Sequence, residues 1–142
     1  MLSKDYIVGL AVGEGSFTVY VRNPNKPTKV KRRVKVEPRF YLKLIEKDKP
    51  ILDELKKFFR CGNVYFQKDS RKNHQNCYRF EVANRQDLEK IIIPFFKENQ
   101  LKFPSKLKDF KIFCNLMERI KKGEHLNSEG LNNLYKIKQK MH

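Results

Sequence analysis

The sequence predicts a mixed α/β chain of the α+β class, with an antiparallel four-stranded sheet packed on helices. Three observations predict this class. Apolar residues change from helical spacing to strict alternation and back, the alternating runs come in two pairs, and turn residues separate the runs. The chain has 142 residues, which suits one hydrophobic core, so we expect a single domain over residues 1–142.

The first helix is expected to begin after Ser3 and to end near Glu14. Ser3 is a suitable N-cap because its hydroxyl can accept a hydrogen bond from a free backbone N–H of the first turn. The residues from 6 to 12 give no polar face, and a helix that is apolar all round is expected to be buried on all sides. Gly15 is expected to end the helix as a C′ residue.

Two features of this helix break local rules. Gly9 and Gly13 share a face and would let another backbone approach closely, at a cost on the order of 1 kcal/mol each relative to alanine. Glu14 lies at the C-terminal end, where the helix dipole disfavours an anion. Either Glu14 has a function at this position, or it merely faces solvent on an ordinary buried helix.

The next elements are a hairpin and a helix. Alternation over residues 16–22 predicts a first strand, and turn chemistry over 23–28 leads into a long second strand over 33–44. Pro38 favours an edge position or a bulge in that strand. An amphipathic helix should follow over 49–59, with Asp48 as its N-cap.

The remaining elements repeat this order and then become helical. A second hairpin is predicted over 63–67 and 77–82, around a polar, basic loop. Asn84 should cap a helix to about residue 96 that Pro94 kinks or ends early. Ser105 should cap a helix over 106–122 that Gly123 ends, and a short helix over 128–141 should close the chain.

The charge balance indicates a polyanionic partner. The chain has 32 Lys and Arg against 16 Asp and Glu, a formal net charge of +16 and a pI near 9.9, and nucleic acid is the first candidate for such a balance. No membrane partner is expected, because no apolar run is long enough to span a bilayer and no signal peptide is visible.

The basic residues gather on the predicted hairpins. Nine of them lie between Gly15 and Ile45, against Glu37 as the only acid. A two-stranded ribbon fits the major groove of DNA, whereas an RNA-reading sheet usually shows more surface aromatics. A solvated, lysine-rich face is the other explanation, and the clustering favours nucleic acid over it. The few surface tyrosines favour double-stranded DNA over RNA. The expected DNA-binding residues are Thr18, Tyr20, Arg22, Lys26, Lys29, Lys31, Arg33, Lys35, Glu37, Arg39, Tyr41, Tyr65, Gln67, Lys68, Arg71, Lys72, Asn73, His74 and Arg79.

The cysteines indicate a reducing compartment. Cys61, Cys77 and Cys114 are few and widely spaced, and they show no zinc-type pattern. We therefore expect an intracellular protein. The richness in Lys, Ile and Asn suits an organelle (chloroplast or mitochondrion) or a bacterial or phage cytoplasm, and the sequence does not choose between them.

The run from Ile7 to Phe17, IVGLAVGEGSF, resembles the signature of the LAGLIDADG homing endonucleases. The order of elements resembles their αββαββα core, and the later run FPSKLKDF over 103–110 resembles the segment before their C-terminal helices. The sixth position of the motif is Val12 where the family name has Asp. The eighth is Glu14, which keeps the carboxylate.

This resemblance implies a site-specific double-strand DNA endonuclease that uses a divalent metal. A single copy of the motif implies a homodimer whose first helices pack through Gly9, Gly13 and Val12, on a long and nearly palindromic target. Glu14 and the carbonyl of Gly13 would bind Mg²⁺ or Mn²⁺, which prefer oxygen ligands.

Basic residues should assist the reaction. By its place in the resemblance, Lys106 is the candidate to offset charge on the phosphate, with Lys108 as the second choice. Lys43 would support the water network. The alternative function is a family member that does not cleave and acts as an intron RNA maturase or a DNA-binding regulator. Glu14 argues against this alternative, because an acid at an unfavourable helix end would then have no purpose.

Overall fold

The structure is a computed structural model that describes residues 1–25 and 34–142. The described residues form two compact units. The first contains residues 1–16 and 39–103, and the second contains residues 17–38 and 104–142. The prediction of one domain over residues 1–142 stays a prediction. Four expected DNA contacts lie outside the described residues: Lys26, Lys29, Lys31 and Arg33.

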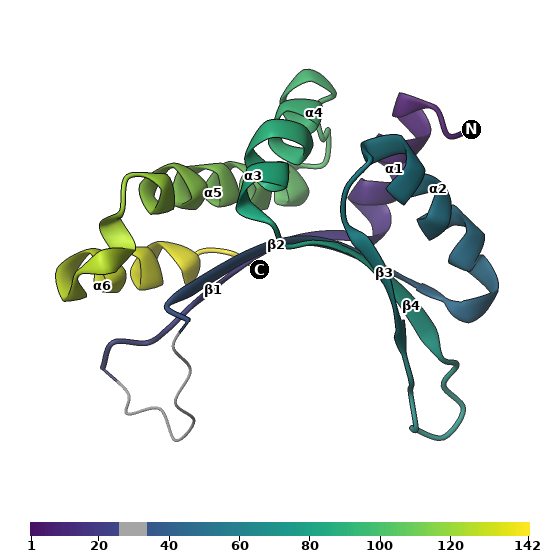
Figure 1. The fold of residues 1–142 in the computed structure, drawn as a ribbon, viewed down its shortest axis with the longest axis horizontal. Coiled ribbons are helices and arrows are strands. Elements are labelled where there is room, and N and C mark those ends of the chain that lie inside the picture. Colours follow the sequence, from purple (N-terminus) through teal and green to yellow (C-terminus); the bar gives the residue numbers. More distant parts are fainter. Residues whose placement is uncertain (26–33) are drawn as a thin grey trace. The chain divides into compact units, whose positions relative to one another are not determined.

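The predicted α+β class and the four-stranded sheet are confirmed. The strands are β1 (Gly15–Val21), β2 (Val36–Ile45), β3 (Asn63–Gln67) and β4 (Cys77–Val82), in the spatial order β1-β2-β4-β3. β4 pairs antiparallel with β2 on one side and with β3 on the other. Figure 1 shows β3 and β4 as a long hairpin closed by a loop at its lower end.

Pro38 lies in an interior strand, so the predicted edge position is wrong. The ladder between β2 and β4 begins only at Phe40. On the other side, the backbone N–H of Arg22 donates to the carbonyl of Lys35 at 2.8 Å. Because antiparallel bonds alternate along a strand, the nitrogen of Pro38 faces away from β1. Its missing N–H therefore removes no ladder bond.

The first helix, α1 (Lys4–Glu14), has the predicted cap, since the Ser3 side chain accepts a hydrogen bond from the backbone N–H of Tyr6 at 3.1 Å. The expectation of burial on all sides is wrong, because only Ile7 and Ala11 of α1 are buried. Gly15 is extended, with φ −79°, and begins β1 rather than serving as a C′ residue. A Cβ at Gly15 would lie 2.7 Å from the carbonyl oxygen of Ala11, so close packing explains this glycine.

The second helix, α2 (Lys49–Phe59), matches its predicted bounds. Asp48 lies at the N-cap, but its side chain makes no capping hydrogen bond. Leu52, Leu55 and Phe59 are buried in the first unit, and the ring of Phe59 stacks on Phe80 with centroids 6.3 Å apart. The buried face of α2 thus covers the apolar side of β4.

A helical segment follows β4 and remains helical through Pro94. It consists of α3 (Arg85–Asp87), a π-helical turn (Leu88–Ile92) and α4 (Ile93–Glu98), and the Asn84 side chain caps it by accepting from the backbone N–H of Asp87. The predicted early end at Pro94 is wrong, and the predicted kink stays a prediction. The π-helical turn directly precedes the proline, and such a turn relieves the clash that a proline ring makes with the preceding carbonyl groups.

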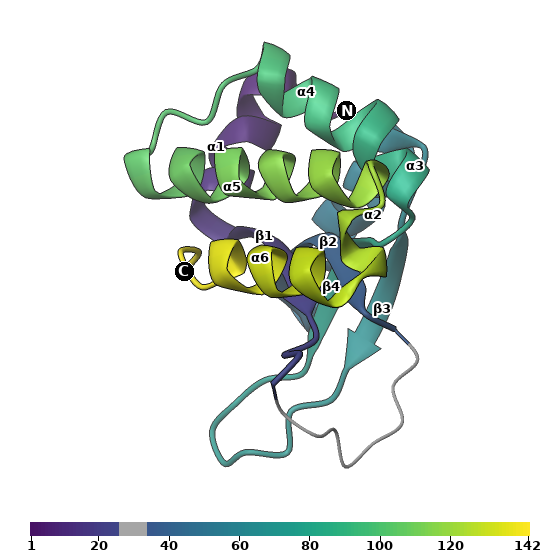
Figure 2. The same cartoon turned by 90° about the vertical axis from the view of Figure 1, so that its left-hand side faces the viewer.

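The second unit contains two long helices, α5 (Pro104–Lys121) and α6 (Ser128–Lys138), which lie side by side in both views (Figures 1 and 2). Phe17 of β1 packs against Phe110 and Phe113 of α5, with ring centroids 5.1 and 5.3 Å away. Ser105 lies inside the first turn of α5, so the predicted cap is wrong, whereas Gly123 ends the helix region at φ +80° as expected. No helix among the described residues has the length and apolar character to cross a membrane.

Candidate nucleic-acid interface

The end of α1 presents an acid and an uncovered face. Glu14 is the last residue of α1 and is exposed, as are Gly9 and Gly13. A Cβ at either glycine would have no atom within 4 Å. Val12 lines a groove beside them together with Phe103, whose side chain is 59% exposed. The fold of the described chain therefore gives no reason for glycine at these two positions.

The predicted polar face of the sheet is confirmed for the strands of the first unit. On β2, β4 and β3, two rows of facing residues cross the sheet. The rows are Lys43–Arg79–Tyr65 and Tyr41–Glu81–Asn63. On the opposite face, Phe40, Leu42, Phe80 and Val82 are buried.

Within this face, Glu81 holds two arginines. Its Oε1 accepts from Nη2 of Arg79 at 2.8 Å and lies 3.7 Å from Nη1 of Arg39. The guanidinium carbon of Arg79 lies 3.6 Å from the centre of the Tyr41 ring, a close cation–π contact. Nε of Arg79 is buried and has no hydrogen-bond partner within the described part of the chain. We call Arg39, Tyr41, Arg79 and Glu81 the strand cluster.

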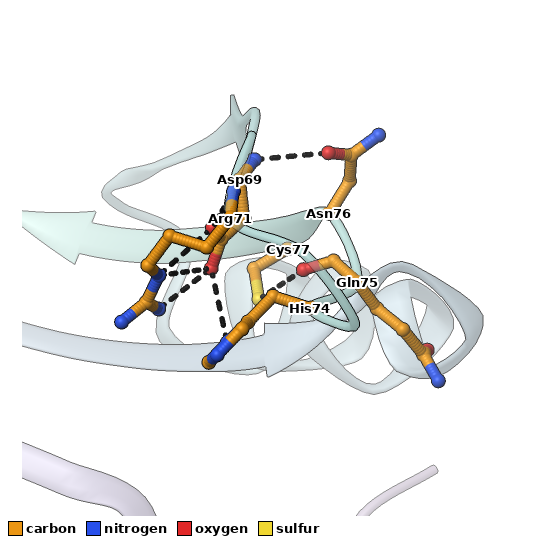
Figure 3. Close-up of polar contacts among 6 residues, drawn as sticks. All are labelled: Asp69, Arg71, His74, Gln75, Asn76 and Cys77. Carbon is orange, nitrogen blue, oxygen red and sulfur yellow. Dashed lines mark hydrogen bonds and ion pairs between the residues drawn. The ribbon is translucent and has the colours of Figure 1, made fainter.

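A second carboxylate organises the loop between β3 and β4, as Figure 3 shows. Asp69 accepts hydrogen bonds from the backbone N–H of Arg71 at 3.0 Å and from its Nη2 at 2.7 Å, and it lies 3.5 Å from Nδ1 of His74. Its own N–H donates to the side chain of Asn76 at 2.9 Å. The Arg71 hydrogen bonds hold the pKa of the Asp69 carboxyl well below its usual range. We call Asp69, Arg71, His74 and Asn76 the loop cluster.

Sequence reasoning missed both carboxylates. For Glu81 the available signal was its place two residues after Arg79, since side chains two apart lie on one face of a strand, whereas the contact with Arg39 depends on strand register. For Asp69 the available signal was an acid two residues before Arg71 in a turn region, since Asp side chains bond the backbone two residues ahead. Arg71 and His74, both expected to contact DNA, lie beside Asp69 in the free chain, and their contact with DNA stays a prediction.

The other expected contacts are placed as follows. Thr18 and Tyr20 are half-buried on β1 and alternate with buried Phe17, Val19 and Val21. Along the loop, Lys68, Lys72 and Asn73 are exposed. Val34, which was expected in the second strand, lies outside β2 and is exposed. Phe66 of β3 is 51% exposed, so the apolar side of β3 is incompletely covered.

The three expected catalytic residues fall in both units. Glu14 and Lys43 belong to the first unit, and both are exposed. Lys106 belongs to the second unit and is half-buried in the first turn of α5, whereas Lys108 is exposed. Their joint action is a prediction.

Oxygen donors at the end of α1 suit a hard divalent cation by type. The exposed Glu14 carboxylate supplies such donors, and the last carbonyl groups of a helix, including that of Gly13, have no partner further along it. Elsewhere in residues 1–25 and 34–142, no group of three or more His, Cys, Asp or Glu side chains could hold a metal ion. One carboxylate cannot supply all the ligands that Mg²⁺ needs. The residues therefore fit a metal whose remaining ligands come from water, phosphate or a second protein chain.

A family model described as LAGLIDADG endonuclease matches residues 7–117. The chain belongs to the LAGLIDADG endonuclease family. The match begins in α1 and ends near the C-terminal end of α5, so it contains all four strands and the three candidate catalytic residues Glu14, Lys43 and Lys106.

Individual relatives agree with this assignment. A probable intron-encoded endonuclease 2 of Neurospora crassa is 32% identical over 131 residues, which are 92% of this chain and 27% of that protein. The crystal structure of the homing endonuclease I-TnaI is 34% identical, with a TM-score of 0.81 over 99% of this chain and 88% of that one. I-SmaMI, in a structure bound to an uncleaved DNA target in the presence of calcium ions, is 31% identical, with a TM-score of 0.82 over 100% of this chain and 45% of that one.

The share of each relative that is matched differs widely. The LAGLIDADG chain spans about a quarter of the Neurospora protein and less than half of the I-SmaMI chain, but most of the I-TnaI chain. The fold of one LAGLIDADG unit is therefore common to chains of very different length.

Proposed function

We propose that this LAGLIDADG chain acts in a site-specific endonuclease that makes double-strand breaks at a long, nearly palindromic DNA target. The observation that carries the proposal is the exposed Glu14 at the end of α1, beside two glycines with open space around them. The cationic face of β2, β3 and β4 and the DNA target bound by I-SmaMI support it. The intron-encoded origin of the Neurospora relative supports action inside the cell, in an organelle or a bacterial or phage cytoplasm.

The proposed assembly is a homodimer through α1. The uncovered face of α1 carries Gly9, Val12 and Gly13, and a second copy of this helix fits the open space that the glycines leave. A close helix pair of this kind recovers the stability that the glycines cost the isolated helix. It would also bring two Glu14 carboxylates to one place.

In this proposal Glu14 and the carbonyl of Gly13 hold Mg²⁺ or Mn²⁺ together with phosphate oxygens of the DNA. The bound cation would activate water and stabilise the leaving oxygen. Lys106 would offset negative charge on the phosphate, and Lys43 would orient water from β2. The half-burial of Lys106 supports its choice over Lys108, since a partly desolvated cation acts more strongly on a nearby phosphate.

The test of cleavage compares the wild type with Glu14→Gln and with Glu129→Gln. Glu129 is an exposed acid on α6, and its variant controls for the loss of one charge. With Mg²⁺ and a plasmid library of candidate sites, we expect double-strand breaks from the wild type and Glu129→Gln. Glu14→Gln should bind the same sites without cutting them. Equal cutting by Glu14→Gln would contradict its role, and tight RNA binding with no DNA cleavage would favour the maturase alternative.

The test of assembly uses Gly9→Leu. The open space around Gly9 means that the single chain should keep its fold, whereas a second α1 could no longer approach. We expect a dimer mass for the wild type and a monomer mass for Gly9→Leu by light scattering, with equal circular dichroism. A monomeric wild type, both free and on DNA, would reject the homodimer.

A further inference from the structure

The strand cluster contains an acid in the centre of a surface that otherwise suits DNA phosphates. Glu81 lies between Arg39 and Arg79, and its side chain is 16% exposed. An acid at this place weakens attraction to a polyanion. Its presence on the DNA-facing surface therefore needs another explanation than affinity.

We propose that Glu81 is a positioning residue that fixes the guanidinium of Arg79 for the reading of one base pair of the target. The inference rests on the proposed function and adds to it a residue that determines specificity. Arg79 is the reader, and Glu81 acts through it.

The guanidinium of Arg79 is held on two sides. Nη2 donates to Glu81 at 2.8 Å, and one face of the group lies 3.6 Å from the centre of the Tyr41 ring. The side chain is only 19% exposed, so few other rotamers are open to it. An arginine that is fixed before binding loses little side-chain entropy on binding, which favours a directional contact.

The edge of this guanidinium remains available for a base. Glu81 accepts one of its five N–H donors, the buried Nε–H is a second, and the stack on Tyr41 occupies a face, so the edge formed by Nη1 and Nη2 keeps three N–H donors. Arginine pairs bidentately with the two major-groove acceptors of guanine. The predicted ligand of Arg79 is therefore a guanine, and Lys43 and Tyr65 flank it in the same cross-strand row.

The effect of removing the Glu81 charge distinguishes a role in base specificity from a role in overall DNA affinity. Loss of the Glu81 charge removes a carboxylate from beside Arg79 and Arg39, and the Arg79 guanidinium can then move toward phosphates. Affinity for a random DNA duplex should stay equal or rise, because phosphate attraction dominates non-specific binding. Preference for one base pair should fall. A residue with a merely structural role would lower both.

The experiment is selection from a double-stranded DNA library with a randomised core, in Ca²⁺, by the wild type, Glu81→Gln, Arg79→Lys and Tyr41→Leu. Glu54→Gln is the matched control, since Glu54 lies on α2 in an exposed pair with Lys57. Thermal unfolding of each variant confirms that it is folded. Tyr41→Leu removes the stack and leaves the acid, so it tests the same positioning if Glu81→Gln is unstable.

We expect Glu81→Gln, Arg79→Lys and Tyr41→Leu to lose preference at the same base pair, by about tenfold or more, while the other positions keep theirs. Glu54→Gln should select the wild-type motif. An unchanged motif for Glu81→Gln, or a uniform loss at all positions together with weaker binding to a random duplex, would overturn the inference. If the wild type selects no motif, the proposed function itself fails.

Discussion

The strand cluster and the loop cluster use the same chemistry in different settings. In each, one carboxylate binds an arginine at under 3 Å, with a second basic side chain nearby. The close pair is two positions apart in both clusters, Arg79–Glu81 on β4 and Asp69–Arg71 in the loop, but the strand cluster adds Arg39 from β2, 42 positions before Glu81. Arg79 is 19% exposed, and Arg71 is 68% exposed.

The strand cluster therefore restrains a side chain, whereas the loop cluster restrains the backbone. The strand cluster restrains guanidinium groups on a rigid sheet, and the Tyr41 ring and the strand register support them. In the loop cluster, two hydrogen bonds fix the backbone: the Arg71 N–H donates to Asp69, and the Asp69 N–H donates to the Asn76 side chain. The Arg71 side chain remains exposed to solvent. Direct base reading suits the first setting, and adjustable phosphate contact suits the second.

The largest expected difference is in stability. Glu81→Ala leaves two partly buried arginines without their acid, so we expect the free energy of unfolding to fall by about 2 kcal/mol. Asp69→Ala should cost clearly less, because only a surface loop opens. Urea denaturation of both variants measures this. Equal losses would remove the distinction between the clusters.

The sequence predicted the parts of these clusters without their connections. Alternation placed Arg39, Tyr41 and Arg79 on one face, and the structure confirms that face. The pairing of Tyr41 with Glu81 depends on strand register, which alternation does not determine, because a shift of two residues keeps every side chain on its face.

The same limit explains the errors in the fold. Local signals predicted the bounds of α2 and the cap at Ser3. Pro38 was placed at an edge because a local rule could not tell where the ladder to β4 begins. Burial of α1 depends on what lies against it, and the apolar pattern alone cannot distinguish a core from an interface with a second molecule.

The next prediction concerns binding to DNA. Asp69→Asn removes the charge that pairs with Arg71 and His74, so both become available to phosphates. We expect tighter binding to a random duplex and a salt dependence that is steeper by about one unit of slope. Titrations at several salt concentrations measure this slope. An unchanged slope would mean that the pair already opens on DNA in the wild type.

A smaller effect should follow pH. Hydrogen bonds from Arg71 lower the pKa of Asp69 in the folded chain. A lowered carboxyl pKa stabilises the folded loop above the ordinary value of about 3.9, and this contribution is lost as pH falls below that value toward the folded-state pKa. Hydrogen exchange of the His74 amide, which donates to the Arg71 carbonyl, should speed up on acidification relative to the intrinsic rate. In Asp69→Asn that pH dependence should be absent, and its persistence would assign the effect to another carboxylate.

The smallest effect tests whether Asp69 or the turn itself holds the loop. Asn73 has φ +67°, a left-handed conformation that costs most residues roughly 1–2 kcal/mol and glycine almost nothing. Asn73→Gly should therefore leave thermal stability nearly unchanged, and Asn73→Ala should lower the free energy of unfolding by about 1 kcal/mol at most. Because Asp69 bonds the chain on both sides of this turn, the His74 amide should stay protected in Asn73→Ala and lose protection in Asp69→Ala. Equal loss in the two variants would mean that the left-handed residue, and not the carboxylate, sets the loop conformation.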